Sequence, residues 1–171
     1  MGVNTSERPL IVVYGSYAKI GKRNGYNKLC EIIMVGRKDL RVSYIKKDIV
    51  GNLDYFKLEP PLHSSKYAEW VTEKSNYYIL NSDFNAIFIL QNCDNSTPWF
   101  EAEFALENKL EDKTLILLEM SEDNGENSAC SLYNKSLLKN KFKNPPIDYF
   151  EYEDFISAWR KIIGKFFSKK M

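Results

Sequence analysis

The chain has 171 residues, which suits one domain with a sizeable core, because domains usually contain about 50 to 250 residues. Its 24 Lys and Arg residues balance 23 Asp and Glu residues, so composition gives no electrostatic basis for binding nucleic acid. Three widely spaced cysteines and one histidine form neither a disulfide framework nor a metal site, and no apolar run approaches the roughly 18 residues that cross a membrane.

We therefore expect a cytoplasmic protein with a single α/β domain over residues 1–171, a disordered lead-in at 1–9 and a tail at 169–171. The apolar, β-branched run from Leu10 to Tyr14 predicts a buried central strand. Gly15, Ser16 and Tyr17 follow as a turn, whose backbone N–H groups can hold a phosphate at the start of the next helix. A tight turn without a ligand is the alternative. Five residues separate Gly15 from Gly21 where a P-loop has four, so we exclude that motif.

The rest of the chain continues to alternate between helical and extended patterns. The spacing of apolar residues predicts, in chain order, a helix at 26–35 ending at Gly36, a strand at 41–50, a helix from Ser64 or Ser65 to about Leu80, strands at Ala86–Leu90 and Thr114–Leu118, a short helix at 132–139, an edge strand at 147–152 and a helix at 154–168. Polar or Pro-rich composition predicts loops at 52–63 and 121–131. The only histidine, His63, ends the first of these loops, where solvent exposure is a simpler interpretation than catalysis.

This alternation predicts a flavodoxin-like, open parallel sheet of five strands with helices on both faces. The common strand order for such a sheet is 2-1-3-4-5, which places the carboxyl ends of strands one and three side by side. Ligands of open α/β sheets usually bind at this edge. We therefore expect residues 14–17 and 92–103 to share a cleft. The residues expected to bind a substrate there are Tyr14, Gly15, Ser16, Tyr17, Asp94, Ser96, Thr97 and Trp99.

The helix after the third strand starts with favourable residues, because Thr97 is a good N-cap and Pro98 suits the first helical position. At about 100° per residue, Glu103 falls between Trp99 and Phe100 on an apolar stripe, whereas Glu101 points to the opposite side. A carboxylate on an apolar stripe is costly to desolvate. Glu103 is therefore the candidate functional residue, and Glu101 is expected to face solvent. The alternative is a Glu103 carboxylate that reaches water at the edge of the helix.

The run from Ser96 to Ala105 resembles the TIR-domain pattern of Ser, then Trp, then Glu four residues after the Trp, then a small residue. On this register Glu103 takes the position of the catalytic glutamate of NAD-cleaving TIR enzymes, and Trp99 that of the pattern's Trp. The resemblance covers about 40 residues around this helix. It implies cleavage of an N-glycosidic bond to a ribose, with NAD as a substrate and no cofactor.

The same segment is similar to the nucleoside 2-deoxyribosyltransferase pattern, D-x-G-T followed by E-x-G-x-A. That register selects Glu101 as the catalytic residue, with Asp94 upstream. Ser96 and Glu103 replace the two glycines of the pattern, and one extra residue separates Thr97 from the glutamate. The two families resemble one another in fold and in the bond they break, so together they imply a class of reaction more than a substrate.

These patterns favour an enzyme that cleaves the N-glycosidic bond of a nucleoside, a nucleotide or NAD, by hydrolysis, transfer or cyclisation. Glu103 would stabilise the cationic sugar, Trp99 or Tyr17 would stack on the base, and Asp94 and Ser96 would hold the ribose or phosphate. The alternative is a non-catalytic, TIR-like or nucleotide-sensing module, because a fold alone does not establish an activity. With 11 Tyr, 10 Phe and 3 Trp residues, the chain is also compatible with a homodimer.

Overall fold

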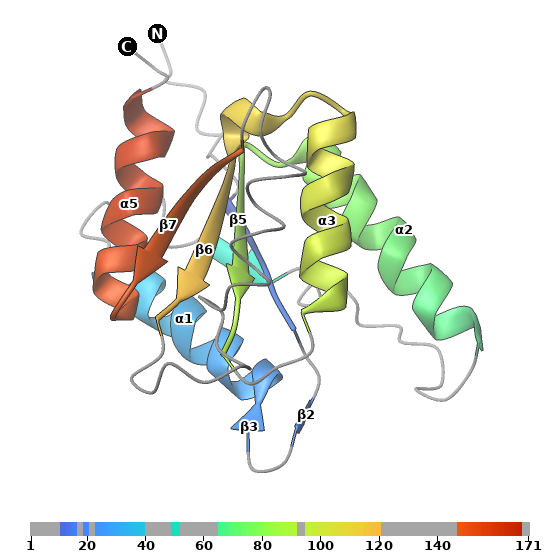
Figure 1. The fold of residues 1–171 in the computed structure, drawn as a ribbon, viewed down its shortest axis with the longest axis horizontal. Helices are drawn as coiled ribbons and strands as arrows, with labels where there is room; N and C mark the ends of the chain where they lie inside the picture. The colour runs from blue at the N-terminus through green and yellow to red at the C-terminus, as the bar shows by residue number, and fades with distance from the viewer. Residues whose placement is uncertain are drawn as a thin grey trace, which may run out of the picture.

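The computed structural model describes residues 11–16, 19–20, 23–39, 49–51, 65–91, 95–120 and 147–168, and the findings below concern these ranges. Their centre is a parallel sheet with helices on both sides (Figure 1). The strands of this sheet are, in spatial order, β4 (Ile49–Gly51), β1 (Ile11–Tyr14), β5 (Phe84–Ile89), β6 (Thr114–Glu119) and β7 (Asp148–Tyr152). The helices are α1 (Gly25–Asp39), α2 (Ser65–Asn81), α3 (Ser96–Glu107) and α5 (Phe155–Ser168), with a short 3-10 helix at Glu111–Lys113.

Three central strands form the part of the sheet on which the candidate site depends. β1 pairs with β5 in parallel, with Ile11 opposite Phe84, and β5 pairs with β6 in parallel, with Asn85 opposite Thr114. All side chains of β1 and β5 are buried, and so are those of β6 up to Leu118. The prediction that these three strands are adjacent, parallel and covered on both faces is confirmed, and with it the α/β class.

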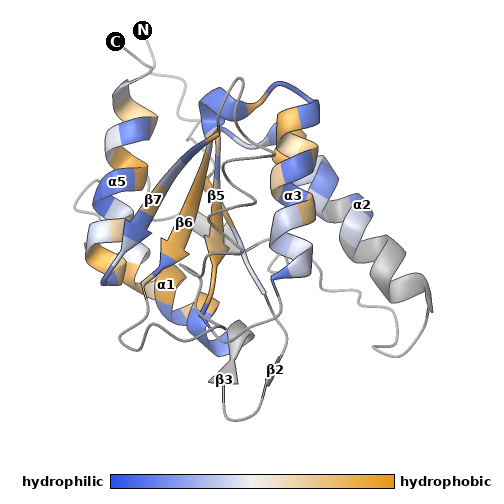
Figure 2. Ribbon diagram, in the orientation of Figure 1, coloured by the Kyte–Doolittle hydropathy of each residue, from blue (hydrophilic) through white to orange (hydrophobic). Residues whose placement is uncertain are grey.

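Successive side chains of a strand point to opposite faces, and this alternation divides the core into two layers. Ile11, Phe84 and Leu115 belong to the layer beneath α1 and α5, together with Ile32 and Trp159 from those helices. The opposite layer, beneath α2 and α3, contains Val12, Tyr14, Ile79, Ile87, Ile89, Ala102, Ala105, Ile116 and Leu118. Figure 2 shows the consequence: the central strands are hydrophobic, whereas the helices carry hydrophilic residues on their outer surfaces. Burial on both faces explains the apolar sequences of these strands.

The bounds of several elements differ from the sequence predictions. α1 continues through Gly36 to Asp39, whereas the glycine was expected to end it. α3 begins at Ser96 with Asn95 as its N-cap, so Thr97 lies inside the first turn. Two short strands, β2 (Lys19–Ile20) and β3 (Arg23–Asn24), form an antiparallel pair between the turn predicted at residues 15–17 and α1, where no strand was predicted. Of the strand predicted at 41–50, residues 49 and 50 are described, and they form β4 together with Gly51.

Several predictions concern residues that the described ranges do not include. These are the lead-in at 1–9, Tyr17, the loop at 52–63 with His63, Asp94, the loop at 121–131, the helix at 132–139 and the tail at 169–171. Within the described ranges, no helix is long and apolar enough to cross a membrane.

Gly36 remains inside α1 because Trp159 of α5 packs directly against it. A Cβ atom at position 36 would lie 2.4 Å from Cε2 and 2.5 Å from Cζ2 of the Trp159 ring, closer than real Cβ contacts allow. The Trp159 indole also donates a hydrogen bond of 2.8 Å to the carbonyl oxygen of Ile32, one turn earlier in α1. The glycine therefore serves close helix packing at this position, and this role explains why it does not terminate the helix.

Gly164 of α5 provides a matched control, because a Cβ atom there would meet nothing within 4 Å. We expect Gly36→Ala to lower the free energy of unfolding by about 1–3 kcal/mol through overpacking against Trp159. Gly164→Ala should raise it by roughly 0.5–1 kcal/mol, because alanine loses less conformational freedom in a helix. Urea unfolding followed by circular dichroism measures both values. Equal stabilities of the two variants would contradict the close α1–α5 contact.

Candidate functional site

The buried face of α3 differs from the face that the apolar residues predicted. Its buried residues follow the helical spacing i, i+3, i+4 and i+7, and they are Pro98, Glu101, Ala102 and Ala105. Ala102 and Ala105 contact the core, while Phe100, assigned to the apolar stripe, is 68% exposed. Small side chains let α3 approach the sheet closely, so residue size decides which face is buried. The prediction that Glu101 faces solvent is wrong: Glu101 is only 4% exposed.

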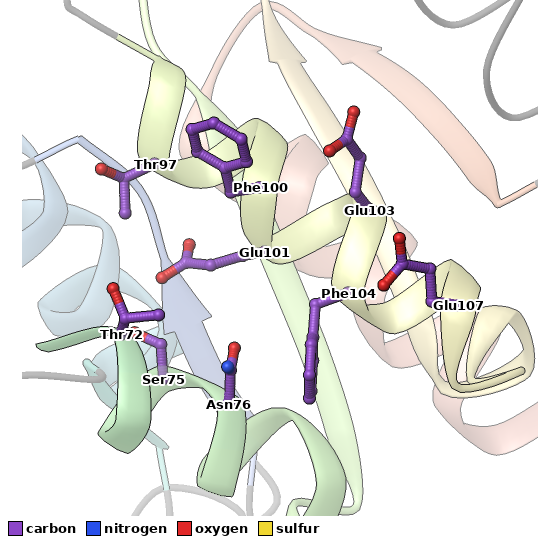
Figure 3. Close-up of a pocket in the computed structure, with 9 residues that line it drawn as sticks. All are labelled: Thr72, Ser75, Asn76, Thr97, Phe100, Glu101, Glu103, Phe104 and Glu107. Atoms are coloured by element: carbon purple, nitrogen blue, oxygen red, sulfur yellow. The ribbon is translucent and has the colours of Figure 1, made fainter. Parts of the chain in front are cut away.

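A pocket of about 370 Å³ lies between α2 and α3, and both candidate glutamates line it. Its lining consists of Thr72, Ser75 and Asn76 from α2 and of Thr97, Phe100, Glu101, Glu103, Phe104 and Glu107 from α3. Figure 3 shows Glu101 pointing from α3 toward Thr72 and Ser75, whereas Glu103 and Glu107 project from another side of the helix. A pocket of this size can hold a small molecule, since ligand sites usually enclose about 300 to 1,000 Å³.

Burial raises the pKa of Glu101 from its ordinary value of 4.5 to about 8. Desolvation is the dominant cause, because a carboxylate loses its hydration when it is enclosed between two helices. A hydrogen bond with the Ser75 side chain favours the charged form and opposes part of this rise in pKa. Glu101 therefore keeps its proton at neutral pH. A carboxyl group in this state can donate a hydrogen bond as well as accept one.

Tyr14, a predicted substrate-binding residue, is fully buried in the core beneath α2 and α3. Its hydroxyl donates a hydrogen bond of 2.9 Å to Asn85 Oδ1, which also accepts a bond of 2.6 Å from the Ser82 hydroxyl. The Asn85 amide in turn donates a bond of 3.0 Å to the carbonyl oxygen of Ile79. This network links β1, β5 and the end of α2 inside the protein. The described contacts of Tyr14 are thus those of a core residue.

The residues after β1 are close to α1. A Cβ atom at Gly15 would lie 2.6 Å from Leu29 Cδ2, so the glycine permits the strand end to approach the helix. Ser16 is buried as well. Tyr17 lies outside the described residues, and Gly15 and Ser16 are not among the described residues that line the α2–α3 pocket.

The remaining predicted site residues lie around the start of α3. Ser96 and Thr97 are exposed, and Thr97 lines the pocket. Trp99 is partly buried and packs against the core beneath α2 and α3, so its described contacts are structural. Asp94 lies outside the described residues. Of the predicted residues, Glu101, Glu103 and Thr97 therefore share one pocket.

Glu119, at the end of β6, was not predicted as part of the site. Its Oε1 atom pairs with Lys28 Nζ of α1, and its Oε2 atom accepts a bond of 2.6 Å from the backbone N–H of Gln91. Asn95 then bonds to both backbone groups of Leu90, accepting from its N–H at 3.0 Å and donating to its carbonyl at 2.8 Å. These contacts hold both ends of the loop between β5 and α3. The available sequence signal was a glutamate ending an otherwise apolar strand.

Within the described ranges, no group of three or more His, Cys, Asp and Glu side chains is arranged to hold a metal ion. No protein-family model matches the chain, and none of the curated proteins matches it. Fold and site therefore define this protein as an α/β domain with a carboxyl-lined pocket between two helices of one sheet face.

The raised pKa of Glu101 predicts a pH-dependent stability. The folded state binds this proton more tightly than the unfolded state, so the stabilisation is complete below about pH 4.5 and is lost as pH rises toward 8. The expected slope approaches about 1.4 kcal/mol per pH unit within that window. Glu101→Gln should remove this slope, whereas Glu107→Gln, at an exposed position, should leave it unchanged. Urea unfolding at several pH values tests the assignment, and equal slopes for wild type and Glu101→Gln would refute it.

Tyr14→Phe tests the structural role of the buried hydroxyl. The substitution leaves Asn85 Oδ1 with the Ser82 bond alone, so we expect a loss of about 0.5–1.5 kcal/mol in the free energy of unfolding. Ligand binding in the α2–α3 pocket should not change, because Tyr14 does not line it. Weakened binding with unchanged stability would instead make Tyr14 a ligand contact.

Proposed function

We propose that this protein cleaves the N-glycosidic bond of a nucleoside, a nucleotide or NAD, and that the reaction takes place in the α2–α3 pocket. The observation that supports the proposal is the presence of two carboxyl groups in different environments in one pocket, with Glu101 buried and Glu103 partly exposed. The resemblance of residues 96–105 to the TIR pattern supports the same class of reaction. Hydrolysis, transfer and cyclisation all fit this chemistry.

In this proposal Glu103 stabilises the sugar. Cleavage of an N-glycosidic bond passes through a cationic, oxocarbenium-like ribose, and a carboxylate beside that sugar lowers the energy of the charge. Glu101 is a weaker candidate for this role, because a group that holds a proton at neutral pH carries no negative charge to offer. The Thr97 hydroxyl and the Asn76 amide are close enough to the pocket to orient the hydroxyl groups of a ribose.

The proposal extends to the finer classification of the fold as flavodoxin-like. The order β4-β1-β5-β6-β7 supports it, because it corresponds to 2-1-3-4-5 when the strands of this sheet are counted along the chain. A cytoplasmic setting belongs to the same proposal, supported by the cysteine spacing. The proposal treats NAD as a substrate and involves neither a cofactor nor a nucleic-acid partner.

A non-catalytic interaction module is the second candidate, because two observations favour it. Phe100 is 68% exposed and Tyr77 of α2 is 57% exposed, as expected for side chains that contact a partner. The described contacts of Tyr14, predicted to bind substrate, are those of a core residue. A homodimer that covers these exposed side chains is one form that such a module would take.

Base release by Glu103→Gln and Glu101→Gln variants separates these possibilities. Each substitution preserves the shape of the side chain and removes its capacity for negative charge. With Glu103 as the charge-stabilising group, Glu103→Gln should lower kcat by about 10²–10³, whereas Glu101→Gln should have little effect at pH 7. The assay incubates each protein with NAD, NADP, nucleosides and deoxynucleosides and measures released base by chromatography.

The outcomes discriminate between the two registers and the module. Loss of activity with Glu101→Gln alone would favour the deoxyribosyltransferase-like register. No turnover of any substrate by folded wild-type protein would favour the interaction module. Circular dichroism of each variant verifies that the fold is retained.

A further inference from the structure

The aromatic residues of α3 differ in what they leave accessible to a ligand. Trp99, expected to stack on the base of a substrate, is partly buried and packs against the core beneath α2 and α3. Phe104 lines the α2–α3 pocket but also packs against that core, so the protein holds its ring in place. Phe100 lines the same pocket and is 68% exposed. The flat apolar surface that a base requires is therefore offered by Phe100 rather than by Trp99.

Asn76 places a polar group on the α2 side of this pocket. Its side chain is partly buried and lines the pocket, and Figure 3 shows it pointing from α2 toward α3. The amides of Asn81 and Asn108 each donate to the backbone carbonyl four residues earlier, whereas in the part of the chain that the structure describes no such bond engages the Asn76 amide. A side-chain amide carries donors next to an acceptor. It can therefore pair with the edge of a base that presents the complementary groups.

From these features we infer that the α2–α3 pocket is a base subsite, in which a planar heterocyclic base stacks on Phe100 while Asn76 pairs with a donor and an adjacent acceptor on the edge of that base. Adenine presents such a pair at its amino group and a ring nitrogen, and nicotinamide presents one in its carboxamide. The inference rests on the proposed function, for which it names the part of the substrate that is recognised. Asn76 then contacts the base, and Thr97 remains to orient the ribose hydroxyl groups.

The two side chains should contribute different properties to binding. Stacking on an aromatic ring raises affinity by about 5–150-fold and accepts any flat base, because every base has an apolar face. Pairing with an amide discriminates between base edges by a similar factor. Loss of the Phe100 ring should therefore weaken binding of all planar ligands. Loss of the Asn76 amide should instead remove the discrimination between them.

Four small probes test the inference by isothermal titration calorimetry, and they form two pairs: adenine with purine, and nicotinamide with pyridine. The members of a pair share a ring, and only the first carries the exocyclic amino or amide group. We expect adenine or nicotinamide to bind more tightly than its ring-only partner by about fivefold or more. The pair that shows this difference identifies the base. None of the probes contains a glycosidic bond, so a protein without activity gives the same answer as an active one.

Variants assign the binding to the two side chains. Phe100→Ala should weaken binding of the preferred probe by about 5–150-fold and retain the fold, because the side chain is exposed. Tyr77→Ala is the matched control and should leave affinity unchanged, since Tyr77 is an aromatic residue of α2 that is 57% exposed and does not line the pocket. Asn76→Leu, which is similar in shape but has no amide, should bring the two members of the preferred pair to equal affinity. Circular dichroism verifies the fold of each variant.

The outcomes separate this inference from the proposed function. No binding of any probe, equal affinity within both pairs, or equal effects of Phe100→Ala and Tyr77→Ala would overturn the inference. So would discrimination that Asn76→Leu leaves unchanged. Base release by wild-type protein alongside any of these results would leave the proposed function in place without this subsite. The expected binding without base release would support the subsite and count against the proposed catalysis.

Discussion

Burial of both faces of β1, β5 and β6 is the constraint on which the rest of the structure depends. A strand with apolar side chains on both sides needs a helical layer on each face. The chain meets this need with α1 and α5 on one face and α2 and α3 on the other. The two layers differ in how their helices pack. Gly36 and Trp159 hold α1 and α5 in close contact, whereas a pocket separates part of α2 from α3.

The fold could be predicted to the extent that it depends on hydrophobic patterning. The central strands were recognisable because their apolar runs are bounded by turn residues, and α5 because its apolar residues recur at the helical period. Gly36 was misinterpreted because glycine favours both helix ends and close packing, and only the position of Trp159, far along the chain, distinguishes these roles. Local sequence carries no information about such a contact.

The helix that carries the candidate site was predicted from the sequence, but the burial of Glu101 on that helix was not. The helix after the third strand was identified correctly, yet hydrophobicity placed Phe100 in the interior and Glu101 in solvent, and the structure shows the reverse. Trp99 and Phe104 do pack against the core, so the error concerns Phe100, which is exposed although its size and hydrophobicity favour burial. Against a flat sheet, Pro98, Ala102 and Ala105 allow a closer approach, and Glu101 is buried because it shares their stripe. The hydrogen bonds of Tyr14 and Glu119 join distant segments and leave little local signal.

The burial of Glu101 makes the stability of the fold depend on pH, and this distinguishes Glu101 from the other buried residues of α3. An apolar side chain at this position would fill the space between the helices without desolvating a charge, whereas the carboxyl group gives up stability as pH rises. Ser75 supplies a hydrogen bond that offsets part of this cost and fixes the group at the pocket wall. A strongly perturbed carboxyl group in a pocket is a common feature of binding and catalytic sites. Its energetic cost therefore makes the α2–α3 pocket a stronger functional candidate than the described part of the turn after β1, where Gly15 and Ser16 are packed into the protein.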